Sequence, residues 1–171
     1  MTLSNQLNSS MNINHLIAPD RTKCLSGISS KKRALESLSK LLGQGAIETD
    51  PNDIFHQLIE RERLGSTGLG HGVALPHGRL NFHSAGQEIG IGCFVKLDQS
   101  IDFDSPDQQP VDLLFGLLVP EECTDEHLQI LATLASMFSD TDFCQKLQDC
   151  KTDEELYTQL SGWALTHQAA S

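Results

Sequence analysis

The segment PVDLLFGLLVP at residues 110–120 is a nearly continuous apolar run with a proline at each end. A strand that is buried on both faces has this pattern, because neither face has to carry polar side chains. The segment IGIGCFVKL at 89–97 alternates as a strand does, and its two glycines let other backbone approach closely. The apolar run therefore predicts a buried central strand.

Helical patterns alternate with these strands along the chain. The segments predicted to be helical are SSKKRALESLSKLLGQG, DPNDIFHQLIERERLG (to about Arg63), TDEHLQILATLASMF, DFCQKLQD and TDEELYTQLSGW. Their predicted N-caps include Ser29 or Ser30, Asp50, Thr124, and Thr152 in a capping box with Glu155. Because helices alternate with strands, the predicted fold is α/β, a single-domain sandwich in which helices flank a mixed central β-sheet.

Two of these helices carry further expectations. The first is predicted to end at Gly43, and the basic run 31–33 in its first turn is predicted to be solvated rather than to dock an acidic partner. The third is predicted to line the core with Leu128, Leu131, Leu134, Ala135 and Phe138.

Composition narrows the function classes and the domain plan. The formal net charge of −11 argues against nucleic acid and anionic membranes. No run approaches the ~18 apolar residues of a membrane span, so no membrane insertion is predicted. Five cysteines without a CxxC pair favour a reducing, cytoplasmic location. We expect a loose, Asn/Ser-rich leader at 1–12, one domain at 13–165 and a tail at 166–171.

The segment GSTGLGHGVALPHGR at 65–79 holds five glycines, two histidines and one proline. It is compatible with a phosphate cradle of backbone N–H groups or with a plain loop that needs positive φ angles. A nucleotide site fails on spacing, because neither a P-loop pattern nor a dinucleotide fingerprint is present. The glycines alone favour the plain loop.

The histidine near the end of this segment changes that balance. Residues 73–75 can form a short strand, and Pro76 biases the residue before it toward extended backbone, so His77 emerges from a stiff element. A neutral imidazole is an available nucleophile near pH 7, and Gly78 leaves room beside it. Ser66 and Thr67 offer hydroxyl groups, and Arg61 offers a fixed positive charge.

Two other histidine patterns occur in the sequence. His71, His77 and His83 recur every six residues, which matches no usual metal-ligand spacing, so no metal site is predicted. His127 falls in the first turn of a predicted helix, where N–H groups suit an anion and depress the pKa of a histidine. Taken alone, the position of His127 favours a partly exposed histidine without a role.

Together these residues resemble a known family. GSTGLGHGVALPHGRL, preceded by RER, resembles the active-site segment of the fructose/mannitol-type enzyme IIA domains of the bacterial phosphoenolpyruvate-dependent phosphotransferase system. Four further segments resemble the nitrogen-regulatory branch in particular: SKKRALE (30–36), PVDLLFGLLVP (110–120), EHLQILATLA (126–135) and TDEELY (152–157). The resemblance covers roughly residues 13–165 and implies the mannitol-type enzyme IIA fold.

The resemblance also implies roles for single residues. His77 would accept a phosphoryl group from an HPr-type carrier protein, His127 would orient that group, and Arg61 would stabilise its charge. The predicted phosphate-binding residues are Ser66, Thr67, Gly68 and Gly70, with no cofactor and no metal. His71 stands where relatives often carry Asn, and it is given no role.

The function expected from the resemblance is that of a regulatory phosphocarrier in phosphohistidine transfer rather than a stand-alone metabolic enzyme. Its phosphorylation state would signal to nitrogen, carbon or ion-transport control, with targets such as ion transporters or sensor kinases. The sequence holds no permease part, which favours regulation. The alternatives are a sugar-specific enzyme IIA component, which passes phosphate to a separate fructose/mannitol-type permease, and a binding module that has lost catalysis.

Overall fold

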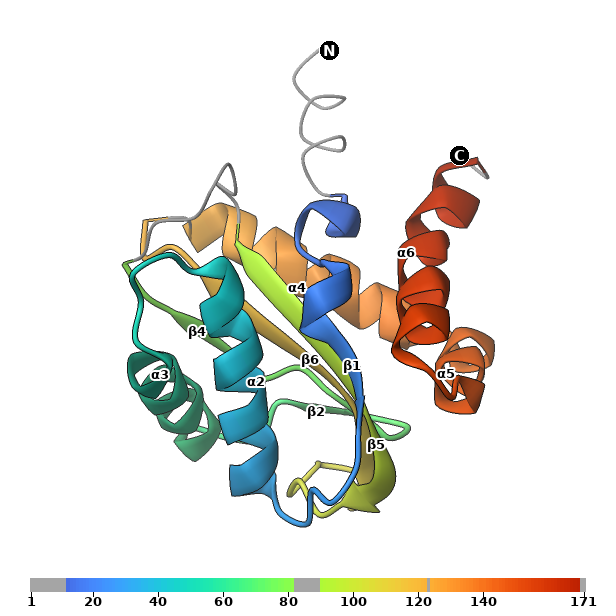
Figure 1. The fold of residues 1–171 in the computed structure, drawn as a ribbon, viewed down its shortest axis with the longest axis horizontal. Helices are drawn as coiled ribbons and strands as arrows, with labels where there is room; N and C mark the ends of the chain where they lie inside the picture. The colour runs from blue at the N-terminus through green and yellow to red at the C-terminus, as the bar shows by residue number, and fades with distance from the viewer. Residues whose placement is uncertain (1–11, 82–89, 123, 170–171) are drawn as a thin grey trace.

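A computed structural model of the protein describes residues 12–81, 90–122 and 124–169 (Figure 1). Its strands are β1 (Thr22–Leu25), β2 (Gly68–Gly70), β3 (Val73–Ala74), β4 (His77–Arg79), β5 (Ile91–Ile101) and β6 (Val111–Val119). Its α-helices are α2 (Lys31–Gly45), α3 (Pro51–Arg63), α4 (Thr124–Phe138), α5 (Thr141–Asp149) and α6 (Asp153–Ala169). Two short 3₁₀ helices, η1 (Ile13–His15) and η2 (Pro19–Arg21), precede β1.

Strand β6 lies at the centre of one mixed sheet. The main order is β1-β5-β6-β3-β2, and β4 also pairs with β6. Strand β5 runs antiparallel to β6, whereas β3 and β4 run parallel to it. Seven of the nine residues in β6 are fully or almost fully buried hydrophobic residues. The buried central strand predicted from residues 110–120 is therefore confirmed.

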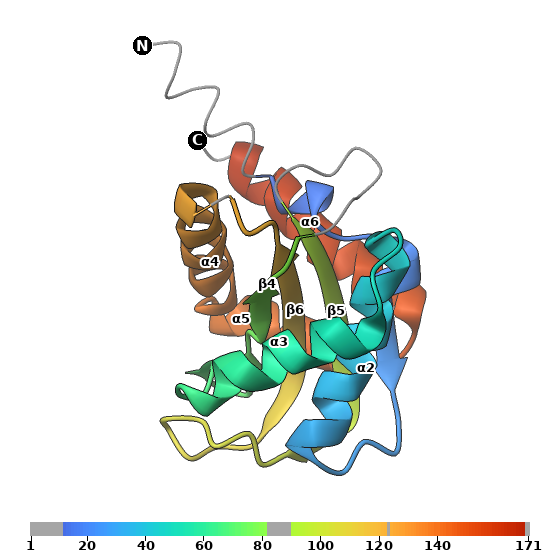
Figure 2. The same cartoon turned by 90° about the vertical axis from the view of Figure 1, so that its left-hand side faces the viewer.

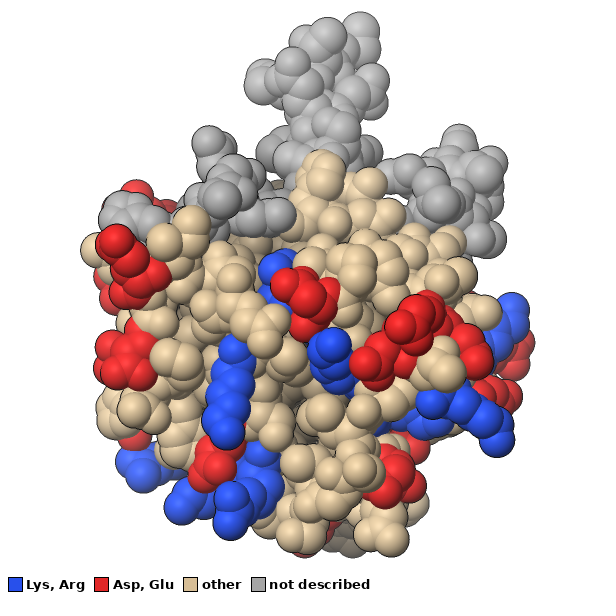
Figure 3. Space-filling model, viewed as in Figure 1, with Lys and Arg blue, Asp and Glu red and all other residues tan. Residues whose placement is uncertain are grey.

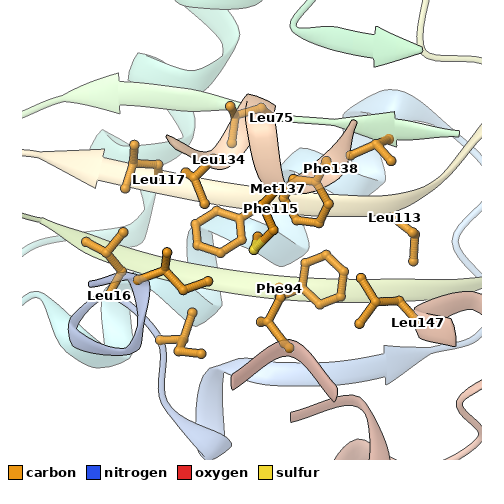
Figure 4. Close-up of a cluster of buried hydrophobic side chains, with 14 of the residues drawn as sticks. Leu16, Leu75, Phe94, Leu113, Phe115, Leu117, Leu134, Met137, Phe138 and Leu147 are labelled. Atoms are coloured by element: carbon orange, nitrogen blue, oxygen red, sulfur yellow. The ribbon is translucent and has the colours of Figure 1, made fainter. Parts of the chain in front are cut away.

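Helices cover both faces of this sheet, as Figures 1 and 2 show. Helices α2 and α3 pack on one face, against alternate residues of β5 and β6 such as Val95 and Leu114. Helices α4, α5 and α6 pack on the other face, where Phe94, Phe115 and Phe138 form the aromatic cluster drawn in Figure 4. The predicted α/β sandwich with a mixed central sheet is confirmed.

Most predicted helix starts are present as side-chain caps. Ser30 accepts a hydrogen bond from the N–H of Arg33, and Asp50 accepts one from Asn52. The N–H of Glu155 donates to the Thr152 hydroxyl. Helix α4 already includes Thr124, so its cap position is residue 123, which lies outside the described residues.

The predicted end of the first helix, Gly43, is wrong by two residues. Helix α2 continues to Gly45, and the N–H of Ala46 still donates to the carbonyl of Leu42. A Cβ at Gly43 would stand 3.1 Å from Cγ of Pro51 at the start of α3. Gly43 therefore permits close packing between the helices instead of ending the first one.

Two side-chain expectations also need correction. Leu128 is 64% exposed, because α4 turns His127, Ile130 and Leu134 toward the sheet and leaves Leu128 on the outer side. Lys31 is not simply solvated, since its ammonium lies 2.9 Å from a carboxylate oxygen of Glu62 and over the ring of Phe103.

The remaining expectations from the sequence concern membrane spans, the charge of the surface and the two ends of the chain. None of the described helices is both long and apolar enough to cross a membrane. On the face seen in Figure 3, acidic and basic side chains are interspersed. Residues 1–11 of the expected leader and His83 lie outside the described residues, while α6 extends to Ala169, into the range expected to be a tail.

Candidate functional site

A pocket opens between α3, β4 and the first turn of α4. Strand β4 lies between α3 and α4 in Figure 2. The pocket is lined by Gln57, Glu60, Arg61, Leu64, His77, Gly78, Arg79 and His127. The structure thus brings together three residues that are far apart in the sequence and that the sequence singled out: Arg61, His77 and His127.

Strand β4 presents His77 to this pocket. The carbonyl of Pro76 accepts a hydrogen bond from the N–H of Leu117, and His77 pairs with Leu117 in the parallel register of β6. Side chains alternate along a strand, so His77 and Arg79 share one face while position 78 faces the other way. A Cβ at Gly78 would stand 3.0 Å from Cβ of Gln57, so the glycine lets α3 approach β4 closely.

The ring of His77 has one nitrogen held by backbone. Its Nδ1 lies 2.8 Å from the carbonyl oxygen of Leu75. A carbonyl oxygen can only accept, so Nδ1 must carry the hydrogen, and in the neutral ring Nε2 keeps its lone pair. Burial lowers the pKa of His77 below its usual value, an effect that the Leu75 hydrogen bond opposes and that Arg61 reinforces. His77 is therefore neutral and nucleophilic at Nε2 near pH 7.

His127 lies beside His77, and its Nδ1 has the opposite hydrogen-bond role. The two ring centroids are 5.3 Å apart, and the ring planes meet at 73°. Nδ1 of His127 accepts a hydrogen bond of 2.9 Å from Nε of Arg79, while its buried Nε2 has no partner among the residues that the structure describes. Burial, with the charge that His77 carries when it is protonated and the fixed charges of Arg79 and Arg61, lowers the pKa of His127 to about 4. The partly exposed histidine considered from the sequence is thus a buried, neutral one.

Arg61 provides a fixed charge at the end of α3. Its Nη1 donates to the carbonyl of Gly65 at 2.9 Å, which ties the guanidinium to the turn that follows the helix. The pocket also contains the carboxylate of Glu60, and an oxygen of that carboxylate lies 2.6 Å from Nη1 of Arg63. An arginine held in this way suits an anion that binds in front of His77.

The hydroxyl groups predicted to bind phosphate point elsewhere. The Ser66 hydroxyl donates to the carbonyl of Phe103 at 2.9 Å and accepts from the N–H of Gly68. The hydroxyl and the N–H of Thr67 both donate to the buried carboxylate of Glu62, whose Oε1 also contacts Lys31. Neither residue lines the pocket, and their contacts are those of a loop support; a phosphate-binding role for them stays a prediction.

Two glycines of this stretch allow a close contact and a positive φ angle in the backbone. A Cβ at Gly68 would stand 2.2 Å from Oγ of Ser105, and Gly70 has a φ of +95°. Neither lines the pocket, so their predicted phosphate contacts also stay predictions. His71, directly after Gly70, is exposed with a φ of 57°, and its N–H donates to Asp107.

Sequence reasoning missed several residues of the pocket, above all Arg79. Because side chains two apart share a face of a strand, a prediction that residues 77–79 are a strand would have found it. Helical spacing from Arg61 would similarly have found the other side chains on the same face of α3, since residues 57, 60, 61 and 64 follow an i, i+3, i+4, i+7 pattern. In the part of the chain that is described, no three His, Cys, Asp or Glu side chains gather to hold a metal ion.

Comparison with known sequences identifies the family of the chain. The sequence model of the family described as "Phosphoenolpyruvate-dependent sugar phosphotransferase system, EIIA 2" matches residues 15–162. The chain belongs to this EIIA 2 family. A nitrogen regulatory protein of Escherichia coli (strain K12) is 44% identical over 128 residues, which are 75% of this chain and 76% of that protein. The resemblance to the nitrogen-regulatory branch is confirmed, and it supports a phosphocarrier role within the phosphotransferase system.

Solved structures of EIIA proteins share the fold. The crystal structure of the nitrogen regulatory protein IIA-Ntr from Neisseria meningitidis matches with a TM-score of 0.75 and 39% identity, and the match covers 86% of this chain and 98% of that one. The mannitol IIA of Escherichia coli matches with a TM-score of 0.66 over 85% of this chain and 98% of that one. At 19% identity the second match shows the fold alone. The mannitol-type fold expected from the sequence is therefore confirmed.

Proposed function

We propose that this chain is a regulatory phosphocarrier that accepts a phosphoryl group on Nε2 of His77 from the phosphohistidine of an HPr-type carrier protein. The observation that carries the proposal is the hydrogen bond from Nδ1 of His77 to the carbonyl of Leu75, because it leaves the Nε2 lone pair as the nucleophile. Membership of the EIIA 2 family and the nitrogen regulatory relatives support the same role.

The transfer needs no proton donor or acceptor. The donor phosphohistidine carries a proton on its other ring nitrogen, so its ring leaves as a neutral imidazole when the N–P bond breaks and the electron pair returns to the ring nitrogen. An N–P bond forms at Nε2 of His77, whose ring takes over the positive charge. His77 keeps its proton on Nδ1 throughout, where the carbonyl of Leu75 holds it. Phosphoryl transfer of this kind depends mainly on positioning and on stabilising the charge of the three phosphoryl oxygens.

Two neighbours of His77 can stabilise the negative charge of the phosphoryl oxygens. Arg61 lines the pocket with a fixed positive charge, and the N–H on Nε2 of His127 is a buried hydrogen-bond donor without a partner among the described residues. The carboxylate of Glu60, which also lines the pocket, forms an ion pair with Arg63. We expect the phosphorylated form to persist long enough to meet a target.

The regulatory part of the proposal is that the phosphorylation state governs nitrogen, carbon or ion-transport control through protein targets such as ion transporters or sensor kinases. The nitrogen regulatory relatives support this part. The proposal includes a cytoplasmic location, and the free thiols of Cys24, Cys93, Cys144 and Cys150 are typical of a reducing compartment.

The test is incubation with a phosphorylated HPr-type donor, followed by intact mass and peptide mapping. We expect one phosphoryl group on His77, and none on His77→Ala. The control is His71→Asn, which changes an exposed histidine in the same stretch and keeps a residue type that tolerates its φ of 57°. Equal phosphate gain by His77→Ala, or no gain by the wild type, would overturn the proposal.

A second measurement separates regulation from sugar uptake. The phosphorylated protein is mixed with the cytosolic domain of a fructose/mannitol-type permease, and loss of phosphate from His77 is followed. Retention of phosphate supports the regulatory function. Rapid transfer to the permease domain would instead make the chain a sugar-specific component.

A further inference from the structure

The side chain of Arg79 forms a hydrogen bond with another side chain of the pocket, and not with the backbone. Its Nε lies 2.9 Å from Nδ1 of His127, which is 48 residues away in the sequence. Arginine is always protonated and cannot accept, so the hydrogen must lie on Arg79 and the lone pair on Nδ1 of His127. The contact therefore defines where the proton of a neutral His127 resides.

That proton has to be on Nε2. Nε2 of His127 is buried and has no hydrogen-bond partner among the described residues. A buried donor without a partner is costly, and such a group is expected at a site that a ligand completes. The ring of His77 is a close neighbour of the His127 ring, with its centroid 5.3 Å away.

The backbone holds Arg79 rigidly in the place that this contact needs. It pairs with Val119 at the end of β6, and the next residue, Leu80, donates its N–H to the carbonyl of Val119. His77 lies on the same face of β4, two residues earlier. One short strand thus carries both the nucleophile and the residue that contacts its neighbour.

We propose that Arg79 is a positioning residue that holds His127 with Nδ1 as acceptor and Nε2–H directed at the phosphoryl group on His77. The effect on transfer rests on the function proposed above, whereas the contact and its effect on His127 do not. By occupying Nδ1, Arg79 also blocks the position where His127 would take a second proton. Arg79 thus acts through His127 and not as a separate charge on the phosphoryl group.

The first experiment uses the unphosphorylated, uniformly ¹⁵N-labelled full chain and needs no donor. Long-range ¹H–¹⁵N spectra of the imidazole rings report which nitrogen of His127 carries the proton, and a pH titration reports its pKa. In the wild type we expect the proton on Nε2 alone. In Arg79→Met we expect an Nδ1–H population to appear and His127 to titrate at higher pH, although His77 and Arg61 still lower its pKa.

Arg79→Lys is the matched control, because a lysine ammonium keeps a donor and a positive charge in place of the guanidinium. We expect it to restore the Nε2–H form at least in part. If the His127 signals and titration are the same in Arg79→Met as in the wild type, the proposal is overturned, whatever the phosphotransfer assays show.

The second experiment is a double-mutant cycle on the transfer rate from a phosphorylated HPr-type donor. Arg79→Met should slow transfer by about tenfold to a hundredfold, as expected when a group at the reacting centre is misplaced. In a His127→Ala background the same change should have almost no further effect, since the residue through which Arg79 acts is gone. An equal loss in both backgrounds would show that Arg79 acts on the phosphoryl group directly and would overturn the positioning role.

Discussion

His77 and His127 lie side by side, yet their Nδ1 atoms have opposite hydrogen-bond roles. Nδ1 of His77 donates to a backbone carbonyl two residues earlier in the chain. Nδ1 of His127 accepts from a side chain 48 residues earlier. The first arrangement leaves a lone pair on Nε2, and the second leaves a hydrogen there. Two identical side chains thus differ in which ring nitrogen carries the hydrogen, because each one contacts a different type of group.

The difference extends to how each arrangement can be lost. The partner of His77 is a carbonyl that every residue at position 75 would supply, so few substitutions remove it. The partner of His127 is the guanidinium of Arg79, so a single substitution does. The arrangement of His77 is therefore protected by local backbone, whereas that of His127 depends on a contact between β4 and α4.

The largest effect on this pair is expected from His127→Ala. Loss of one preorganised donor to a developing charge typically costs 10²–10³-fold in rate, and we expect a decrease of about that size in transfer to His77. His127→Gln, whose amide N–H can replace Nε2–H, should lose less than His127→Asn, whose amide reaches only the Nδ1 position. Stopped-flow or quench-flow transfer rates provide the measurement; a normal rate for His127→Ala would remove the residue from the mechanism.

A pH dependence of stability is the next expected effect. Folded His127 has a pKa of about 4 against an ordinary 6.5, so below pH 6.5 the unfolded chain binds a proton that the folded chain does not. Stability is then fully present above about pH 6.5 and falls as the pH drops toward 4, by at most about 1.4 kcal/mol per pH unit. The lowered pKa of His77 acts in the same direction. Urea unfolding at several pH values measures the slope, and His127→Gln should reduce it.

Gly78→Ala tests the spacing between α3 and β4. The added Cβ would stand 3.0 Å from Cβ of Gln57 and should displace α3 together with Arg61. We expect about a tenfold slower transfer, because a small misplacement of a charge at the reacting centre is costly. The positions of the protons on the His77 and His127 rings should remain as in the wild type. A matched control is Gly162→Ala, where a Cβ meets no described atom within 4 Å.

The smallest effect is expected from Pro76→Ala, next to the nucleophile. Pro76 reduces the number of backbone conformations open to the unfolded chain. An alanine would also place an additional N–H group at a buried position. We expect a loss of about 1 kcal/mol in the free energy of unfolding, with the transfer rate almost unchanged. The reason is that the carbonyl of Leu75 still holds Nδ1 of His77. A large fall in rate would show that the position of the His77 ring depends on more than the carbonyl of Leu75.

Much of the fold could be predicted from short-range patterns. The apolar run at 110–120 predicted the buried strand β6, and the caps Ser30 and Asp50 predicted two helix starts, because strand burial and helix capping depend on residues close in sequence. The rotation of α4 could not be predicted in this way. Leu128 fits an apolar stripe, but the packing of α4 on the sheet turns His127 inward instead.

The same division applies to the site. The stiff Leu-Pro lead-in to His77 is a local feature, so the sequence could single out His77 as a candidate, and the family resemblance added the predicted role of phosphoryl acceptor. Two side-chain hydrogen bonds could not be predicted: that of Thr67 with the carboxylate of Glu62 and that of His127 with Arg79. Each depends on which side chains the folded chain brings together. Pairing of β4 with β6 and the packing of α3 and α4 beside it place residues 61, 77, 79 and 127 in one pocket. Backbone geometry near one residue is a short-range property, whereas the position of a proton on His127 depends on a contact that exists only after the sheet has formed.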